Sequence, residues 1–193
     1  MWDGPLPKEY PILQEPAVDE LQCLNISLTV SKKALEKNGK SLPILIFIHG
    51  GALVGGNQAL QCAGRGLFDM HDLVQRSMST RKPIIGMTIN YRVGPLGFLA
   101  SKELAAFNTS HGEPAGNYGF HDQARAIEWV SRFINGFGGD PARVIIHGTS
   151  AGSISCHQLS VFPKRLFSRV ILASGVISTL GIALIEEHQE IYD

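Results

Sequence analysis

The junction at residues 143–160 constrains the fold most, because the apolar run "RVIIHG" passes through "TSAGS" into a segment with helix-forming character. Gly148-Thr149-Ser150-Ala151-Gly152 fits G-x-S-x-G, the pattern of a sharp strand-to-helix turn that presents a nucleophilic serine. Glycine at both ends removes side chains where strand and helix crowd, so Ser150 can adopt a strained backbone conformation. The alternative is a serine that caps an ordinary helix. The flanking strand and helix favour the nucleophile.

Apolar runs and helical segments alternate along the rest of the chain. Continuous apolar runs, typical of buried strands, lie at 43–51, 82–92, 143–148 and 168–175, and an alternating half-buried strand at 24–30. Helical segments are expected within 66–77, at 117–134 and directly after Ser150. The pattern predicts an α/β fold: a mostly parallel central sheet with helices on both faces. We expect one domain over residues 1–193, with an irregular arm at 1–20.

The segment 117–134 carries the clearest helical periodicity. A stripe of apolar residues predicts its buried face: Ala126, Val130, Phe133 and Phe137, widened by Ile127 and Ile134. The sequence "NGFGGDP" after it contains the glycines and the proline that end helices.

A second motif, "HGGA" at 49–52, follows the first apolar run. Acyl transfer needs backbone N–H donors aimed at the oxyanion of a tetrahedral intermediate, and a Gly-rich loop at a strand end can offer them. A phosphate-binding loop is the alternative. It is disfavoured because "GGALVGGNQ" contains neither G-x-G-x-x-G nor G-x-x-x-x-G-K-[ST].

Composition excludes several other functions. Seventeen basic and seventeen acidic residues cancel, and no run of Lys or Arg exceeds two residues, so nucleic acid is not an expected partner. No apolar run approaches the about 20 residues that span a bilayer. The start lacks the pattern of a signal peptide, and the localisation is left open between cytoplasm and secretion. Cys23, Cys62 and Cys156 are odd in number and lack metal-ligand spacing, so no metal site is expected.

Longer stretches carry a resemblance to a known family. "ILIFIHGGALVGG", "INYRVGPLGFLAS", "GNYGFHDQARAIEWVSRFINGFGGDPARVIIHGTSAG" and "LFSRVILASG" occur in the order and near the spacing found in type-B carboxylesterases. That family includes the cholinesterases and the fungal lipases and esterases, and the chain is most similar to the fungal type. The resemblance runs from about Leu21 to Gly175.

The resemblance implies an α/β-hydrolase fold and a serine-type ester hydrolase without a cofactor. Ser150 corresponds to the acylated nucleophile, and the N–H groups of Gly51, Ala52 and Ala151 to the oxyanion hole. The implied substrate is a neutral carboxylic ester. Structural positions are implied for Asn117, Asp122, Gln123 and Trp129. Cys23 resembles the family cysteine whose disulfide partner lies upstream in full-length members.

The chain departs from the family pattern at several points. Thr149 replaces the usual Glu, which disfavours cationic choline esters, and Ala52 replaces a third glycine and narrows the acyl pocket. The triad acid and histidine follow the nucleophile in this family. Only His157 and His188 do so here, and His157 lies roughly 10 Å along the helix from Ser150. We expect His188 to belong to a solvated helix end.

These departures leave alternatives open. We expect a domain truncated after the strand that follows the nucleophile helix, whose parent function is ester hydrolysis. A non-catalytic fragment or pseudo-enzyme that binds esters, or an interaction module, is the alternative. The strand at 168–175 is expected to expose an apolar sheet edge and to promote self-association.

Overall fold

The computed structural model describes residues 22–36, 41–62, 65–181 and 183–193. The irregular arm expected at 1–20 lies outside these residues. The strands are β1 (Ile26–Thr29), β2 (Leu42–Ile48), β3 (Gln61–Cys62), β4 (Arg65–Gly66), β5 (Ile85–Ile89), β6 (Gly139–Thr149) and β7 (Arg169–Ala173). The α-helices are α1 (His71–Ser79), α2 (Gly94–Phe98), α3 (Lys102–Ser110), α4 (Tyr118–Phe133), α5 (Ala151–Ser160) and α6 (Ile185–Tyr192). Short 3₁₀ helices are η1 (Lys32–Leu35), η2 (Ile134–Phe137) and η3 (Ile177–Thr179).

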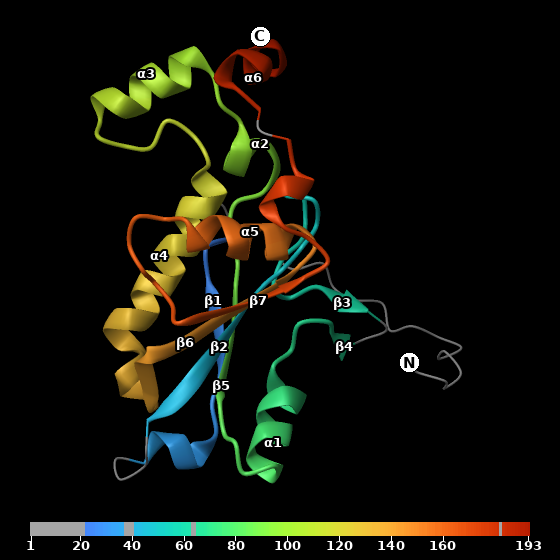
Figure 1. Cartoon of the computed structure of the whole chain (residues 1–193), viewed down its shortest axis with the longest axis vertical. Helices are drawn as coiled ribbons and strands as arrows, with labels where there is room; N and C mark the ends of the chain where they lie inside the picture. The colour runs from blue at the N-terminus through green and yellow to red at the C-terminus, as the bar shows by residue number, and fades with distance from the viewer. Residues whose placement is uncertain (1–21, 37–40, 63–64, 182) are drawn as a thin grey trace.

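The main sheet has the order β1-β5-β2-β6-β7 (Figure 1). β5, β2, β6 and β7 run parallel, and only β1 is antiparallel to its neighbour. In the centre, Ile46 pairs with Met87 on one side and with Ile146 on the other. The predicted mostly parallel sheet is therefore confirmed, and β2 and β6 are interior strands.

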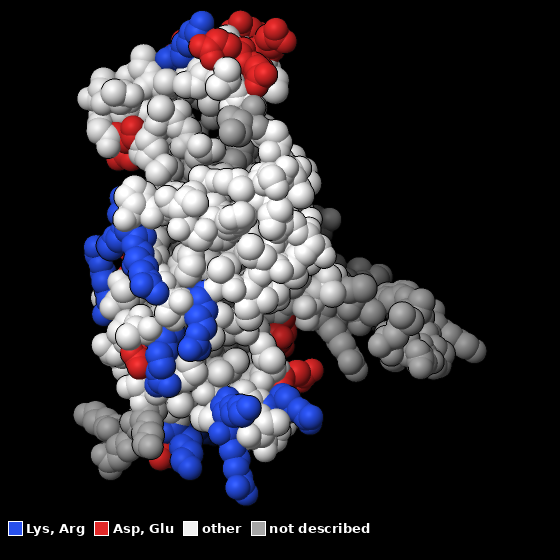
Figure 2. All heavy atoms as spheres, viewed as in Figure 1, with Lys and Arg blue, Asp and Glu red and all other residues white. Residues whose placement is uncertain are grey.

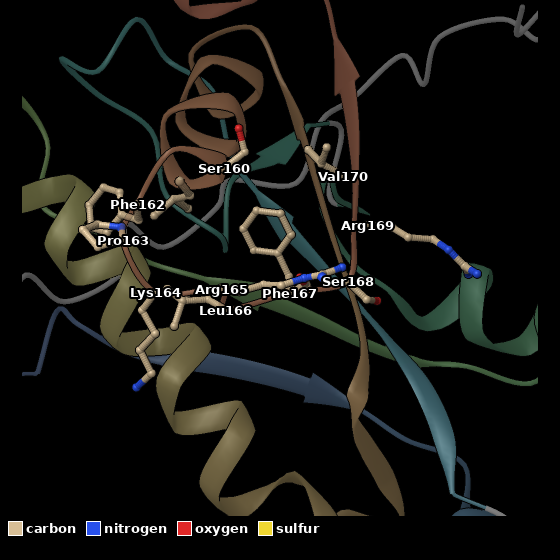
Figure 3. Close-up of a pocket in the computed structure, with 11 residues that line it drawn as sticks. Ser160, Phe162, Pro163, Lys164, Arg165, Leu166, Phe167, Ser168, Arg169 and Val170 are labelled. Atoms are coloured by element: carbon tan, nitrogen blue, oxygen red, sulfur yellow. The ribbon is translucent and has the colours of Figure 1, made fainter.

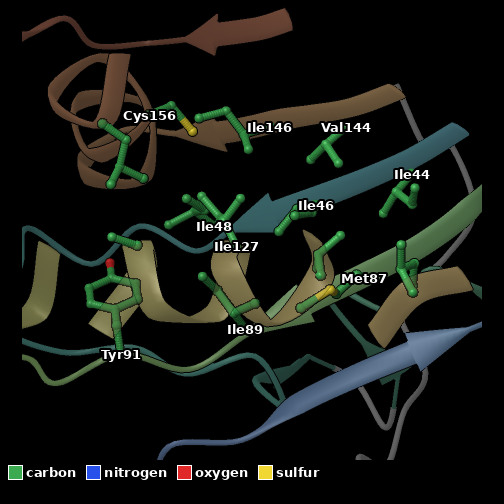
Figure 4. Close-up of a cluster of buried hydrophobic side chains, with 14 of the residues drawn as sticks. Ile44, Ile46, Ile48, Met87, Ile89, Tyr91, Ile127, Val144, Ile146 and Cys156 are labelled. Atoms are coloured by element: carbon green, nitrogen blue, oxygen red, sulfur yellow. The ribbon is translucent and has the colours of Figure 1, made fainter. Parts of the chain in front are cut away.

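The core lies between this sheet and the helices α4 and α5 (Figure 4). Ile46, Met87 and Ile146 point to that face and have no exposed surface. Side chains alternate across a strand, so Gly86 faces the other way, where a Cβ would lie 2.6 Å from that of Met70, at the start of α1. Helices thus cover both faces, as predicted.

The buried face of α4 differs from the expected one. Ile127 and Val130 are fully buried, but Phe133 is 52% exposed and Phe137 37% exposed. The face against the sheet also contains Gln123, whose amide donates to Ser155 Oγ at 3.1 Å and is thereby accommodated in the core. Periodicity of apolar residues could not reveal a buried glutamine. The two phenylalanines instead pack around the Trp129 ring near the surface.

The loop after β5 is anchored to α4 by an ion pair. Arg92 donates to Asp122 from its backbone N at 3.0 Å and from Nε and a terminal nitrogen at 2.7 Å each. The Asp122 side chain is only 8% exposed. This contact fixes the beginning of α4, whose capping residue Asn117 is left-handed with φ 57°.

The sheet edge agrees with expectation, and two helices were missed. The strand at 168–175 was expected to expose an apolar sheet edge, and β7 lies at the edge of the sheet, where Val170, Ile171 and Leu172 are 37–50% exposed. α2 and α3 were not predicted as helices, whereas the segment of α6 was expected to contain a helix end at His188. In Figure 1, α3 and α6 lie together at the end of the molecule opposite α1, and Gln189 bridges them by accepting from the Lys102 N–H at 2.9 Å.

Candidate active site

The turn between β6 and α5 holds Ser150 in a strained conformation. Its φ of 57° and ψ of −126° lie outside the regions that L-residues favour. The backbone N–H of Ser150 donates to the Ala173 carbonyl on β7 at 2.9 Å. A side chain on Gly148 would come within 2.2 Å of Gly152, and one on Gly152 within 2.1 Å of the Ile48 carbonyl oxygen. Both glycines are therefore required for the turn, as the sequence predicts.

The loop after β2 forms a second tight turn. Gly51, Ala52 and Leu53 have φ values of 117°, 56° and 64° in succession. The Gly51 carbonyl accepts from the N–H groups of Val54 at 3.0 Å and Gly55 at 3.1 Å, which closes the turn. A left-handed alanine costs about 1 kcal/mol relative to ordinary backbone. The loop holds this conformation at a cost, which is common where backbone groups serve a ligand.

The two turns touch each other. A Cβ on Gly50 would lie 2.7 Å from the Thr149 carbonyl oxygen and 3.3 Å from the Ser150 Cβ. Within the described part of the chain, the N–H groups of Gly51, Ala52 and Ala151 donate no hydrogen bond. Three amide donors without acceptors thus lie on the two turns that meet at Ser150. Their assignment as an oxyanion hole stays a prediction.

No base lies beside the Ser150 hydroxyl in the described ranges of the chain. Among the residues that the structure describes, Ser150 Oγ makes no hydrogen bond to any side chain, although the residue is exposed at the surface. His157 Nδ1 accepts instead from the Ile177 N–H at 3.2 Å, about two turns along α5 from Ser150. His188 was expected in a helix end exposed to solvent. It is instead half-buried and lines a cavity.

That cavity has a volume of about 770 Å³ and begins next to the loop after β2, residues 49–53, which is called the oxyanion loop after its predicted role. Leu53 and Val54 form one wall, and Ile154, one turn along α5 from Ser150, forms another. The remaining lining comes from α2, the start of α4 and the segment after η3, including Pro95, Phe98, Phe120, Ile177, Leu180 and Ile191. Apart from His188 no titratable side chain lines it.

A smaller cavity of about 340 Å³ lies at the other end of α5, between Leu159 and Val170 (Figure 3). Lys164, Arg165 and Arg169 contribute basic side chains to its lining. Its position at the C-terminal end of α5 separates it from Ser150, at the N-terminal end of the same helix. We assign it no part in the site.

Two residues beside the oxyanion loop were not singled out as functional in the sequence. His49 is 1% exposed and Tyr91 is 4% exposed, and their rings stack with centroids 4.3 Å apart. Burial lowers the pKa of His49, opposed by a hydrogen bond to the Gly50 carbonyl. Burial raises the pKa of Tyr91. Their proximity could not be read from the sequence, since 42 positions separate them.

Cys156 lies behind the turn, on the core side of α5. Burial raises the pKa of its thiol to about 12, so it is a neutral thiol near neutral pH. No group of three or more His, Cys, Asp or Glu in the described ranges could hold a metal ion. None of the helices described is both long and apolar enough to cross a membrane.

Charged side chains avoid the middle of the face shown in Figure 2. Acidic groups gather at the end formed by α6, and basic groups gather along the α4 side toward the opposite end. The area over α5 between them is uncharged, and α5 itself contains no Lys, Arg, Asp or Glu.

Comparison with known proteins bears on the family and the fold of the chain. The sequence model of the carboxylesterase family matches residues 8–189. Lipase 1 of Yarrowia lipolytica is 35% identical over 97% of this chain and 36% of its own length. The bile salt-activated lipase of Bos taurus is 38% identical over 86% of this chain and 26% of its own length. Relatives from yeasts and mammals thus occur at similar identity and do not single out the fungal type.

A solved structure described as PNB esterase superposes with a TM-score of 0.66 and 33% identity, covering 86% of this chain and 32% of that one. The chain therefore spans about a third or less of these relatives. The family match, the identities and the fold lead to one assignment: the chain belongs to the carboxylesterase family, with the α/β-hydrolase fold.

Proposed function

We propose that this chain carries the nucleophile and the oxyanion hole of a serine carboxylic ester hydrolase. We take residues 1–193 as part of a single α/β-hydrolase domain. The contact between the two strained turns carries the proposal, because it brings unpaired N–H groups of Gly51, Ala52 and Ala151 to the turn that exposes Ser150.

The reaction would proceed through an acyl-enzyme. Ser150 Oγ attacks the ester carbonyl carbon while its proton passes to a base, and the carbonyl oxygen becomes negative. The N–H groups stabilise that charge; losing one such donor slows catalysis by about 10²–10³-fold in a well-studied protease. The C–O bond then breaks, and the alcohol leaves with the proton. Water attacks the acyl group, which releases the carboxylic acid and restores the serine hydroxyl.

The proposed substrate is a neutral carboxylic ester. Thr149 places no carboxylate beside Ser150, so nothing at that position attracts a cationic alcohol group. The Ala52 methyl group, which replaces a glycine, narrows the space at the oxyanion loop. The apolar cavity that starts at Leu53 provides a water-poor surface beside the site. These features favour an uncharged ester over a charged one.

One observation favours a second candidate function, the binding of esters without turnover. Within the described residues, no side chain is placed to accept the Ser150 proton. An intact oxyanion hole without a base still gives residual rate enhancement of about 10³–10⁴-fold in proteases. The two candidates therefore differ in rate and not in the location of the site.

Labelling with a fluorophosphonate tests the proposal. The probe phosphonylates Ser150 Oγ, and fluoride leaves. We expect mass spectrometry to place the adduct on Ser150, and Ser150→Ala to abolish it. Ser160→Ala is the matched control, since Ser160 lies exposed at the other end of α5. Labelling accompanied by hydrolysis of 4-nitrophenyl butyrate supports the hydrolase, whereas labelling without turnover supports the binding candidate. Absence of any adduct at Ser150 would refute the site.

A further inference from the structure

His49 makes a hydrogen bond that determines which of its ring nitrogens carries the hydrogen. Its Nδ1 lies 2.8 Å from the Gly50 carbonyl oxygen. A carbonyl oxygen can only accept, so Nδ1 is the donor. The other nitrogen, Nε2, is buried and has no hydrogen-bond partner in the described part of the chain. Native proteins rarely leave a buried polar atom unpaired, so the orientation of this ring is maintained against an energetic cost.

Tyr91 holds both the ring and the backbone of His49. The two rings stack with an interplanar angle of 15°. The Tyr91 hydroxyl also donates to the His49 carbonyl oxygen at 2.7 Å. Because Tyr91 lies two residues after β5, these two contacts tie the loop after β2 to the segment that follows the neighbouring strand.

A third segment closes over the same hydrogen bond. Gly56 has φ 101°, and a Cβ there would lie 2.6 Å from the Gly50 carbonyl oxygen and 2.8 Å from His49 Nδ1. A side chain at this position would therefore collide with both atoms of the bond. The backbone at Gly56 packs against the bond and shields it from solvent.

The orientation of the Gly50 carbonyl also determines where the next N–H group in the chain points. In a trans peptide the C=O of one residue and the N–H of the next point in opposite directions in one plane. The hydrogen bond from His49 to the Gly50 carbonyl therefore fixes the direction of the Gly51 N–H. This is the first of the three unpaired donors at the site.

We propose that His49, held by Tyr91, is a positioning residue that aims the Gly51 N–H into the oxyanion hole. The inference rests on the proposed function, since it assigns the Gly51 N–H a role in stabilising the oxyanion. His49 does not touch the substrate and transfers no proton. If His49 only filled space, any ring of similar size would preserve the reaction at Ser150. If His49 is a positioning residue, the reaction requires the Nδ1 donor.

Substitutions of His49 separate these roles. His49→Phe keeps a stacked ring and removes the donor, His49→Asn places an amide nitrogen near the position of Nδ1, and His49→Gln places it near Nε2. The readout is fluorophosphonate labelling of Ser150 at several probe concentrations, resolved into a maximal rate and a probe-binding constant. We expect His49→Phe and His49→Gln to lower the maximal rate about tenfold to a hundredfold, and His49→Asn about threefold or less. The binding constant should stay unchanged.

Tyr91→Phe tests the second support and avoids the risk that a His49 variant fails to fold. It removes only the hydroxyl that donates to the His49 carbonyl, and we expect about a threefold to tenfold lower maximal rate. The matched control is Tyr118→Phe, whose hydroxyl accepts from Asn108 away from the site. Equal rates for Tyr91→Phe and Tyr118→Phe, or a His49→Asn no faster than His49→Phe, would overturn the inference.

Nitrogen-15 NMR of the histidine rings gives a readout that needs no reaction. We expect His49 as the neutral form with hydrogen on Nδ1 and none on Nε2. The opposite tautomer would overturn the inference even if Ser150 is labelled. An unlabelled wild-type Ser150 with the expected tautomer would instead refute the proposed function, because no reactive oxyanion hole would remain for His49 to position, and the inference would fall with it.

Discussion

β6 and β7 are adjacent parallel strands with nearly the same sequence, "RVII" at 143–146 and "RVIL" at 169–172, yet their environments differ. Val144 is 1% and Ile146 0% exposed, whereas Val170 is 38% and Ile171 50% exposed. β6 pairs with β2 and β7, but β7 pairs only with β6 in the described residues. The sequence therefore determines that both segments are strands, and the neighbouring elements determine which one is buried.

The same difference separates the roles of the two strands. β6 ends beside β2, so its terminal turn meets the oxyanion loop, and Ser150 lies where the two interior strands end. β7 supports the turn through the Ala173 carbonyl, which accepts from the Ser150 N–H. In the proposed site, an interior strand supplies the nucleophile, and the edge strand supports the turn that carries it.

The largest expected contrast comes from truncating one isoleucine on each strand. Ile146→Ala leaves a cavity in a close-packed core and should lower the free energy of unfolding by about 3 kcal/mol. Ile171→Ala removes a half-exposed side chain and should cost about 1 kcal/mol or less. Urea unfolding followed by circular dichroism measures both. Equal losses would show that β7 is as well covered as β6.

Two ion pairs should show a similar contrast between a buried and an exposed carboxylate. Asp122→Asn weakens the pair between a nearly buried carboxylate and Arg92 and should lower the free energy of unfolding by about 2 kcal/mol. Asp140→Asn weakens the more exposed pair with Arg143 at the beginning of β6 and should change the free energy of unfolding very little. Unfolding at low and at high salt provides the check, since only the exposed pair should be strongly screened.

The free energy of unfolding should depend on pH because the His49 ring is buried. The folded state lowers the pKa of His49 below 6.5, so the unfolded chain takes up the proton first as the pH falls. The free energy of unfolding should therefore decrease as the pH falls below about 6.5 and stop decreasing below the lowered pKa. Unfolding curves of the wild type and His49→Asn across that range give the comparison. A decrease of the same size in both would assign the effect to other groups.

The smallest effect on stability is expected at the exposed edge. Ile171→Lys should change the free energy of unfolding by about 0.5 kcal/mol or less. It should nevertheless reduce self-association, because a charge on an edge strand discourages pairing with another sheet. Sedimentation velocity at several concentrations measures this, with Val161→Lys as a control at an exposed position outside the sheet. Concentration-independent sedimentation of the wild type would contradict the proposed self-association.

Local patterns predicted the interior of the molecule well. The glycines around Ser150 are needed for a turn that leaves no room for side chains, and that requirement is visible in five residues. The continuous apolar runs of β2, β5 and β6 predicted buried strands in the same direct way. Buried Gln123 and exposed Phe133 shifted the expected face of α4, because the glutamine amide nitrogen donates to a distant partner, Ser155.

Contacts between distant segments were beyond the sequence patterns. α2 contains a proline and two glycines within five residues, so its helical character is hidden in the sequence. His188 was expected in solvent but faces a cavity formed by five separate segments. The stacking of His49 on Tyr91 depends on two strands pairing, and single-strand periodicity carries no information about it.

A crystal structure of the chain after reaction with a fluorophosphonate tests the central claim most directly. The account predicts a covalent bond from Ser150 Oγ to phosphorus, with the phosphoryl oxygen about 2.7–3.1 Å from the amide nitrogens of Gly51, Ala52 and Ala151. An adduct on another residue, or a phosphoryl oxygen directed away from these three amides, would contradict it.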